Sequence, residues 1–166
     1  MKSKKGIIII LISAFLLVAA AAFVLYSLSG GASGPEEAVT AYRKACMLYD
    51  ASDMVKYSSD YNKYMLNGNK TPESDGQLKE YLEKSYASVQ SGYSDSSIEI
   101  RFSGTRYITE GSEEYNALTA EYSGIAGTDG INGFAVSDIN VYADGRKVMS
   151  RSDYTVKIGS KWYYFK

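Results

Sequence analysis

The amino-acid sequence predicts an α+β protein with an N-terminal transmembrane helix, followed by helices packed on one face of a curved antiparallel sheet. Apolar residues recur with the helical period of about 3.6 between residues 35 and 90. After Gly92 the period changes to about 2, which is typical of a half-buried strand. The third observation is the apolar, uncharged segment 7–28, which predicts the transmembrane helix.

The segment from Ile7 to Leu28 contains no charged residue. At about 1.5 Å per residue a helix of this length reaches about 33 Å, enough to cross a bilayer core. Lysines flank it only on the N-terminal side, so we expect a signal anchor with residues 1–6 in the cytoplasm. A cleaved signal peptide is the alternative, because Gly30 and Ala32 have the spacing that signal peptidase prefers, and the domain would then be secreted.

The remainder is expected to be a flexible linker, residues 29–34, and one extracytoplasmic α+β domain, residues 35–166. The chain is 45% hydrophobic and 22% charged, as in an ordinary folded protein. The three lysines of the tail leave 15 Lys and Arg against 19 Asp and Glu, a net charge of −4. Without a basic excess we expect neither nucleic acid nor an anionic membrane surface as a partner of the domain.

Three helices are expected at the start of the domain. Pro35, followed by two glutamates, starts a helix that runs to about Asp50. Ser52 is the expected cap of a second helix that extends to Met65. A third helix is expected over residues 75–90, where one apolar stripe keeps helical spacing.

The second half of the domain is expected to contain strands around one short helix. Residues 98–102 alternate as a half-buried strand. Ser112 is the expected cap of a helix that Gly124 closes. Three antiparallel strands follow, over residues 134–142, 148–158 and 161–165.

The connections between these last strands also carry signals. The apolar phase changes within residues 134–142, which predicts a β-bulge near Ser137 and Asp138. Asp144-Gly145 is a favoured two-residue hairpin turn. That turn would place Val141 opposite Val148 and Ile139 opposite Ser150.

Three segments carry a family resemblance: AVTAYRKACMLYDASDMVKY, SIEIRFSGTRYITEGSEEY and YTVKIGSKWYYF. With this order and spacing, residues 35–166 resemble small membrane-anchored bacterial domains of the nuclear transport factor 2-like superfamily, which has a cystatin-like fold. The most specific part is the strand and glycine turn before Lys161, Trp162 and Tyr163. The resemblance implies a cone between helices and sheet, but many such bacterial domains have no assigned activity.

The orientation of Trp162 is the one point on which strand alternation and resemblance disagree. A two-residue turn at Gly159-Ser160 would place Trp162 and Tyr164 on the face opposite Tyr163 and Phe165. The resemblance implies that Trp162 packs inward, and we expect this. An exposed Trp162 would instead belong to an apolar outer patch with Tyr142, Met149 and Tyr164.

Several chemistries are excluded by composition. The chain has no histidine, so a Ser-His-Asp triad, a Cys-His pair and a histidine-based zinc site cannot form. Cys46 is expected to be a core residue. The loop 124–133 lacks the Gly-Lys-Ser/Thr ending of a phosphate cradle and the closing glutamate of a calcium loop, so we expect a flexible connection. No cofactor or metal is expected.

Tyrosine is the abundant aromatic residue, with 16 copies against 5 phenylalanines and 1 tryptophan. Its apolar ring and polar tip suit a wet pocket or an interface, and the alternative is that these rings fill the core. The candidate binding residues are Tyr57, Tyr61, Tyr86, Asp138, Tyr154 and Trp162.

Enzymes of the resembled superfamily hold acid and base side chains inside the cone. The carboxylates that could do so alternate with apolar residues, so we expect them to face solvent. They are Glu99, Glu121, Asp138 and Asp153.

We therefore expect a non-catalytic, membrane-tethered module of the bacterial cell envelope that contacts an envelope protein or a small ligand. One alternative is a subunit of a secretion or conjugation apparatus, which an obligate oligomer would support. The other is an enzyme that uses a buried carboxylate in the cone. The sequence leaves the oligomeric state open.

Overall fold

The computed structural model describes residues 30–166. The expected cytoplasmic tail and transmembrane helix, residues 1–6 and 7–28, lie outside the described residues. Within residues 30–166 no helix combines the length and the apolar character needed to cross a membrane. The chain divides into two units, Met1–Gly30 and Gly31–Lys166, and every element below belongs to the second.

The α+β class is confirmed for the described residues, with five helices and one antiparallel sheet of order β1-β2-β3-β4. The elements are α2 (Pro35–Leu48), α3 (Ala51–Tyr57), α4 (Asp60–Leu66), α5 (Asp75–Tyr86), β1 (Ile98–Tyr107), α6 (Glu113–Ala126), β2 (Ile131–Ala143), β3 (Arg146–Ile158) and β4 (Lys161–Tyr164).

The helix expected from Ser52 to Met65 is two helices. The Asp50 side chain caps α3, and the Ser59 side chain caps α4 by accepting a hydrogen bond from the amide of Asn62. Between them the chain is extended, because Ser58 forms a bridge with Tyr164 and the Ser59 amide donates to the Tyr164 carbonyl. Contact with the last strand therefore interrupts a continuous helical pattern.

The other two helix predictions need only small adjustments. Ser74 caps α5, which ends at Tyr86 rather than at residue 90. Ser112 caps α6 as predicted, by accepting a hydrogen bond from the Tyr115 amide. This helix continues past Gly124 to Ala126 and ends at Gly127, whose positive φ of +76° suits a glycine.

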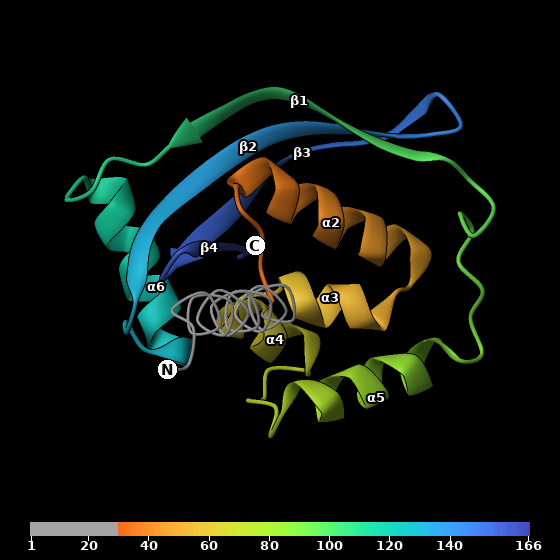
Figure 1. Ribbon diagram of the computed structural model, residues 1–166, viewed down its shortest axis with the longest axis horizontal. Helices are drawn as coiled ribbons and strands as arrows, with labels where there is room; N and C mark the ends of the chain where they lie inside the picture. The colour runs from red at the N-terminus through yellow and green to blue at the C-terminus, as the bar shows by residue number, and fades with distance from the viewer. Residues whose placement is uncertain (1–29) are drawn as a thin grey trace, which may run out of the picture. The chain divides into compact units, whose positions relative to one another are not determined.

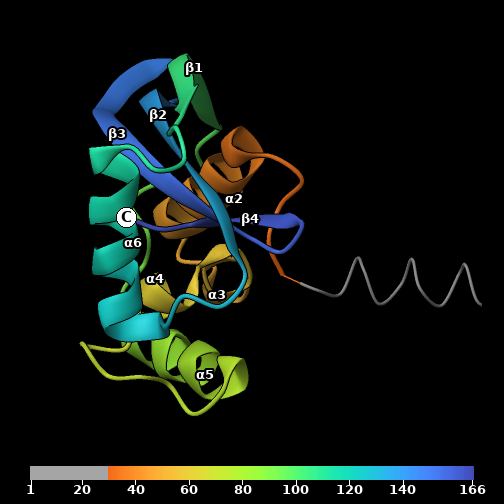
Figure 2. The ribbon, with the colours of Figure 1, turned by 90° about the vertical axis from the view of Figure 1, so that its left-hand side faces the viewer.

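Helices lie on both faces of the sheet, not on one face as expected (Figures 1 and 2). Ala38 of α2 packs with Ala135 of β2. Leu118 and Tyr122 of α6 pack with the neighbouring Phe134. Successive strand residues point to opposite faces, so α2 covers one face of the sheet and α6 covers the other.

The bulge expected in β2 near Ser137 and Asp138 lies instead in β1, at Ser103 opposite this position. Alternate residues of β2 stay buried from Ala135 to Ala143 without a change of phase. Phe134 is also buried, because α6 covers its face of the sheet. Its apolar side chain therefore gives the sequence the same change of phase that a bulge would give.

The hairpin turn at Asp144-Gly145 is confirmed, with φ +50° and +77° at its two residues. The predicted register is wrong by one residue, because Val148 is an extra residue that bulges from β3. Val141 therefore pairs with Met149, and the partner of Ile139 is likewise one residue further along the strand. Val148 itself is 40% exposed.

Trp162 packs inward, as expected, and is 6% exposed. It lies with Ala32 and Ala38 on the α2 side of the sheet, while Tyr163 packs with Phe165 on the α6 side. Two predictions are therefore both correct: Trp162 and Tyr163 point to opposite faces of β4, and Trp162 is buried. They agree because both faces of β4 are covered. The outer apolar patch does not form around Trp162.

Part of the expected linker is fixed to the domain. Ala32 exchanges backbone hydrogen bonds with Trp162, and its side chain is buried. Gly31 has φ +82°, and a Cβ built on it would lie 2.7 Å from the ring of Tyr163. Glycine is therefore required at residue 31 both for its backbone conformation and for space.

We expect Gly31→Ala to lower the free energy of unfolding by about 1–3 kcal/mol, through backbone strain and contact with Tyr163. The measurement is chemical denaturation followed by the fluorescence of Trp162. Gly92→Ala is the control, since a Cβ there has no neighbour within 4 Å and φ is not in the left-handed region. Equal stability of the two variants would contradict this role of Gly31.

Burial in the cluster around Phe165 raises the pKa of Tyr122 to about 12. An unfolded tyrosine has a pKa of about 10, so the contribution of Tyr122 to stability is present below pH 10 and is lost as the pH rises to 12. We expect the free energy of unfolding of Tyr122→Phe to fall less than that of the wild type as the pH rises from 10 to 12. Urea denaturation of both proteins at a series of alkaline pH values measures this difference. An equal fall in both proteins would contradict the raised pKa of Tyr122.

Candidate functional site

A buried ion pair occupies the space between α2 and the sheet. The Arg43 guanidinium donates from Nε to Oδ2 of Asp153 at 2.7 Å and from Nη2 to Oδ1 at 2.6 Å. Asp153 of β3 is completely buried and Arg43 is 8% exposed. Such a two-point contact fixes the orientation of both side chains.

Two further side chains complete this buried network. Tyr164 accepts a hydrogen bond from Arg43, and its hydroxyl lies 3.3 Å from Oδ1 of Asp153. The half-exposed Arg151 places Nε 2.6 Å from the same oxygen. The ring of Tyr42 stacks on Tyr164 with centroids 3.8 Å apart. Both carboxylate oxygens of Asp153 are therefore occupied by donors from this chain.

The protonation states follow from these contacts. Burial opposes the charge on Arg43 most strongly, but the hydrogen bond to Asp153 and the neighbouring negative charge together outweigh it and raise the pKa of the guanidinium. Burial also raises the pKa of Tyr164 and of the Cys46 thiol, so both stay protonated at neutral pH. Cys46 packs against the core cluster of α2, α3 and α5, where the protonated thiol acts as a small apolar group.

The expectation that Asp153 faces solvent is wrong. Alternation in β3 places it on the face that α2 covers, and its partner comes from a helix 110 residues earlier. The signal in the sequence was Arg43, a charged residue within the stripe of α2 that holds Val39 and Tyr42. A lone arginine among apolar residues indicates a buried carboxylate partner.

The structure does not bring the five candidate aromatic side chains together. Tyr57 and Trp162 share a cluster on the α2 side, Tyr61 and Tyr154 pack around Phe165 on the α6 side, and Tyr86 lies against the cluster of α2, α3 and α5. Tyr86 stacks on Tyr49, with centroids 4.6 Å apart.

Asp138 and Tyr154 do line one hollow, of about 430 Å³, on the face of the sheet away from α2. Asp138 is exposed there and accepts a hydrogen bond of 2.5 Å from Ser152. Arg106 lines the same hollow and is paired with Glu114 at the start of α6. The cation and the anion of this hollow come from different strands, β1 and β2.

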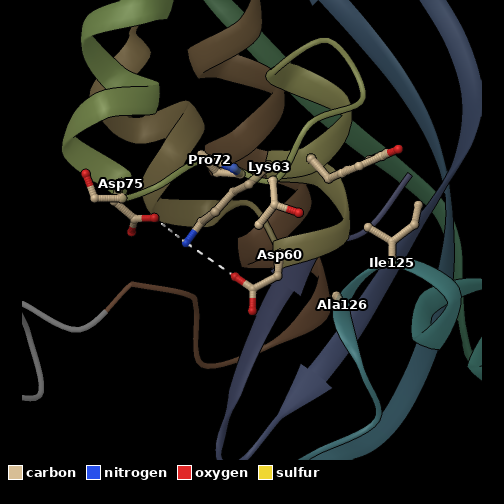
Figure 3. A pocket seen from close by; sticks show the side chains of 9 residues that line it. Asp60, Lys63, Pro72, Asp75, Ile125 and Ala126 are labelled. Atoms are coloured by element: carbon tan, nitrogen blue, oxygen red, sulfur yellow. Dashed lines mark ion pairs between the residues drawn. The ribbon is translucent and has the colours of Figure 1, made fainter.

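A second hollow, of about 260 Å³, lies between α4, the segment before α5 and the end of α6 (Figure 3). Lys63 crosses it, with Nζ 2.7 Å from Asp75 and 3.7 Å from Asp60. Ile125 and Ala126 form an apolar wall. Sequence reasoning missed this hollow, because its parts come from three separated segments.

A third hollow, of about 310 Å³, lies where α2 begins. Glu36, Glu37 and Thr105 line it, together with Tyr107, which is 63% exposed. The Thr105 hydroxyl donates to Glu36 at 2.7 Å. In the described residues, no group of three or more histidine, cysteine, aspartate or glutamate side chains is placed to hold a metal ion.

Comparison of the chain with family models, curated proteins and solved structures gives no match.

Replacing one member of the buried pair should be costly. We expect Asp153→Leu to lower the free energy of unfolding by about 3–5 kcal/mol, because it leaves the buried charge of Arg43 without its partner. The double variant Arg43→Met with Asp153→Leu should recover most of this loss, since apolar side chains then fill the space.

Denaturation curves of the three proteins measure this effect. Glu80→Gln, which breaks an exposed pair with Lys84 on α5, is the control and should give no resolvable change. A double variant no more stable than Asp153→Leu would contradict a space-filling role for the pair.

Proposed function

We propose that this chain is a non-catalytic binding or assembly module, anchored in the membrane by residues 7–28, with its domain on the extracytoplasmic side. In this proposal the domain contacts an envelope protein or a small ligand through its outer surface. Its fold is proposed to be of the nuclear transport factor 2-like type, with α2 lying in the concave side of a curved sheet (Figure 1).

The observation that carries this proposal is the filled space between α2 and the sheet. In a catalytic cone this space would hold a substrate beside an acid or base. Here the Arg43 and Asp153 pair occupies it together with Tyr164, and apolar side chains of α2 and β2 pack beside the pair. Space for a partner is found instead in hollows on the outside, among them the three described above.

The enzyme alternative needs a carboxylate that can exchange a proton with a bound substrate. Asp153 is enclosed and already accepts hydrogen bonds on both oxygens. Asp138 and Glu99 are exposed to water on the face of the sheet opposite α2. These positions favour binding over catalysis.

The test is to place a photoreactive benzoylphenylalanine at one tyrosine in each hollow of the full chain, in its native membrane. The positions are Tyr64, Tyr107 and Tyr154. We expect a discrete adduct from at least one position, and its mass distinguishes a small ligand, a different protein and a second copy of this chain. Tyr81, an exposed tyrosine of α5, is the control.

Adducts no stronger at the hollows than at Tyr81 would contradict a binding role for the outer surface. A chemical turnover that depends on Asp138 would contradict the non-catalytic proposal directly.

A further inference from the structure

One edge of the sheet is open in the described part of the chain. At the β4 edge, Ala32 and Ser58 form bridges with Trp162 and Tyr164. At the other edge, β2 is the one described strand with which β1 pairs. An unpaired edge strand presents a row of backbone donors and acceptors that another strand can use.

The hydrogen bonds to β2 determine which residues of β1 face outward. The Asp144 amide donates to the Ser97 carbonyl at 3.0 Å, so these two residues form a hydrogen-bonded pair. Such pairs alternate along an antiparallel ladder, and Glu99 and Arg101 therefore bond to β2. The residues whose backbone groups point to the open edge are Ile98, Ile100 and Phe102.

The open run ends at both sides. The Ser96 amide already donates to the carbonyl of Tyr93. On the other side, the bulge at Ser103 shifts the register and reverses which residues face outward. The segment from Ile98 to Phe102 is therefore the longest run of β1 that can form a regular ladder with another strand.

The side chains of this segment alternate between the two faces of the sheet. Ile98, Ile100 and Phe102 are half-buried against the cluster of Val39, Ile139 and Val141. Glu99 and Arg101 are exposed on the opposite face and are paired, with Nε 2.7 Å from Oε1. Arg101 also lies over the ring of Tyr142, 4.2 Å from its centroid.

We propose that a second copy of this chain pairs with β1 through this edge, antiparallel, with Ile100 on the two-fold axis. Ile98 of one copy then lies opposite Phe102 of the other, and their outward backbone groups form the ladder. On the outer face Glu99 lies opposite Arg101 of the second copy, twice by symmetry. The segment is thus complementary to itself in both charge and apolar alternation.

Charge also selects this register among its neighbours. A ladder forms only where outward-facing residues of one copy lie opposite outward-facing residues of the other. When one copy shifts to the next register of this kind, the two residue numbers of each pair add up to a sum that is larger or smaller by two. The next register on one side places Glu99 opposite Glu99, and the next on the other places Arg101 opposite Arg101. Like charges directly opposite each other are destabilising, so both are disfavoured.

This pairing does not depend on the proposed function, and its test uses the full chain in mild detergent. Sedimentation equilibrium measures the dimer dissociation constant of the wild type, of E99R and of R101E. Each single variant places like charges opposite each other in the proposed register. We expect the dissociation constant to rise at least 10-fold in both variants.

An equimolar mixture of E99R and R101E tests directly whether opposite charges across the edge restore the dimer. One copy then carries two positive charges on this face and the other carries two negative charges, so the mixed pair regains both opposite-charge contacts. We expect the mixture to form dimers as tightly as the wild type, with one copy of each variant in every dimer. Different tags on the two variants identify these mixed dimers.

K84E is the control, because it reverses an exposed charge on α5, an element that lies outside the sheet. It should leave the dissociation constant unchanged. A monomeric wild type, dimers insensitive to E99R and R101E, or a mixture that stays monomeric would each overturn the proposed pairing. None of these results would affect the photocrosslinking test, since a monomer can still bind a partner in its hollows.

Discussion

The filled space between α2 and the sheet, which holds the buried pair of Arg43 and Asp153, is the constraint on which the rest of this domain depends. The pair joins α2, the first helix of the described residues, to β3, and Tyr164 extends this contact to β4. A completely buried carboxylate is tolerated only when hydrogen-bond donors satisfy it. The pair therefore specifies the distance of α2 from the sheet and the rotation of α2 about its own axis. Because β4 is held in this way, it can in turn bridge to Ala32 and Ser58, which cover its outer edge.

The same contact determines which surfaces are left for function. A helix in the concave side of a curved sheet can enclose a ligand only if the side chains between them leave space. Here polar and aromatic side chains fill the space, with Tyr42 stacked on Tyr164. The tyrosines that suggested one pocket instead serve several packing clusters on the two faces of the sheet. Recognition by this domain is therefore proposed to take place on its outer hollows and at the open edge of β1.

Local signals in the sequence predicted local structure well. Ser112 caps α6, and the turns at Asp144-Gly145 and Gly159-Ser160 form where expected, because capping and turn geometry depend on a few adjacent residues. The class of the fold followed from the change of period. The break between α3 and α4 was missed because β4, about 100 residues later, causes it. The packing of α6 on the face of the sheet opposite α2 also depends on residues distant in sequence, and so does the bulge at Val148.

The site was predictable to a smaller extent for the same reason. A carboxylate that alternates with apolar residues has the same pattern in a solvated strand and in a strand that meets a buried arginine, so the pattern alone predicts that Asp153 faces solvent. Asp138 and Tyr154 do share one hollow, but its remaining lining comes mainly from β1. Pairing of separate segments cannot be obtained from periodicity in a single segment.

The most direct test of the filled interior is the NMR signal of the Arg43 Nε–H group. If Arg43 is enclosed and bound to Asp153, this signal is protected from exchange with water, and a scalar coupling across the hydrogen bond links it to the Asp153 carboxylate. A guanidinium signal that exchanges rapidly and shows no such coupling would mean that the space between α2 and the sheet is open to solvent. That result would contradict the proposal that binding takes place on the outer surface of the domain.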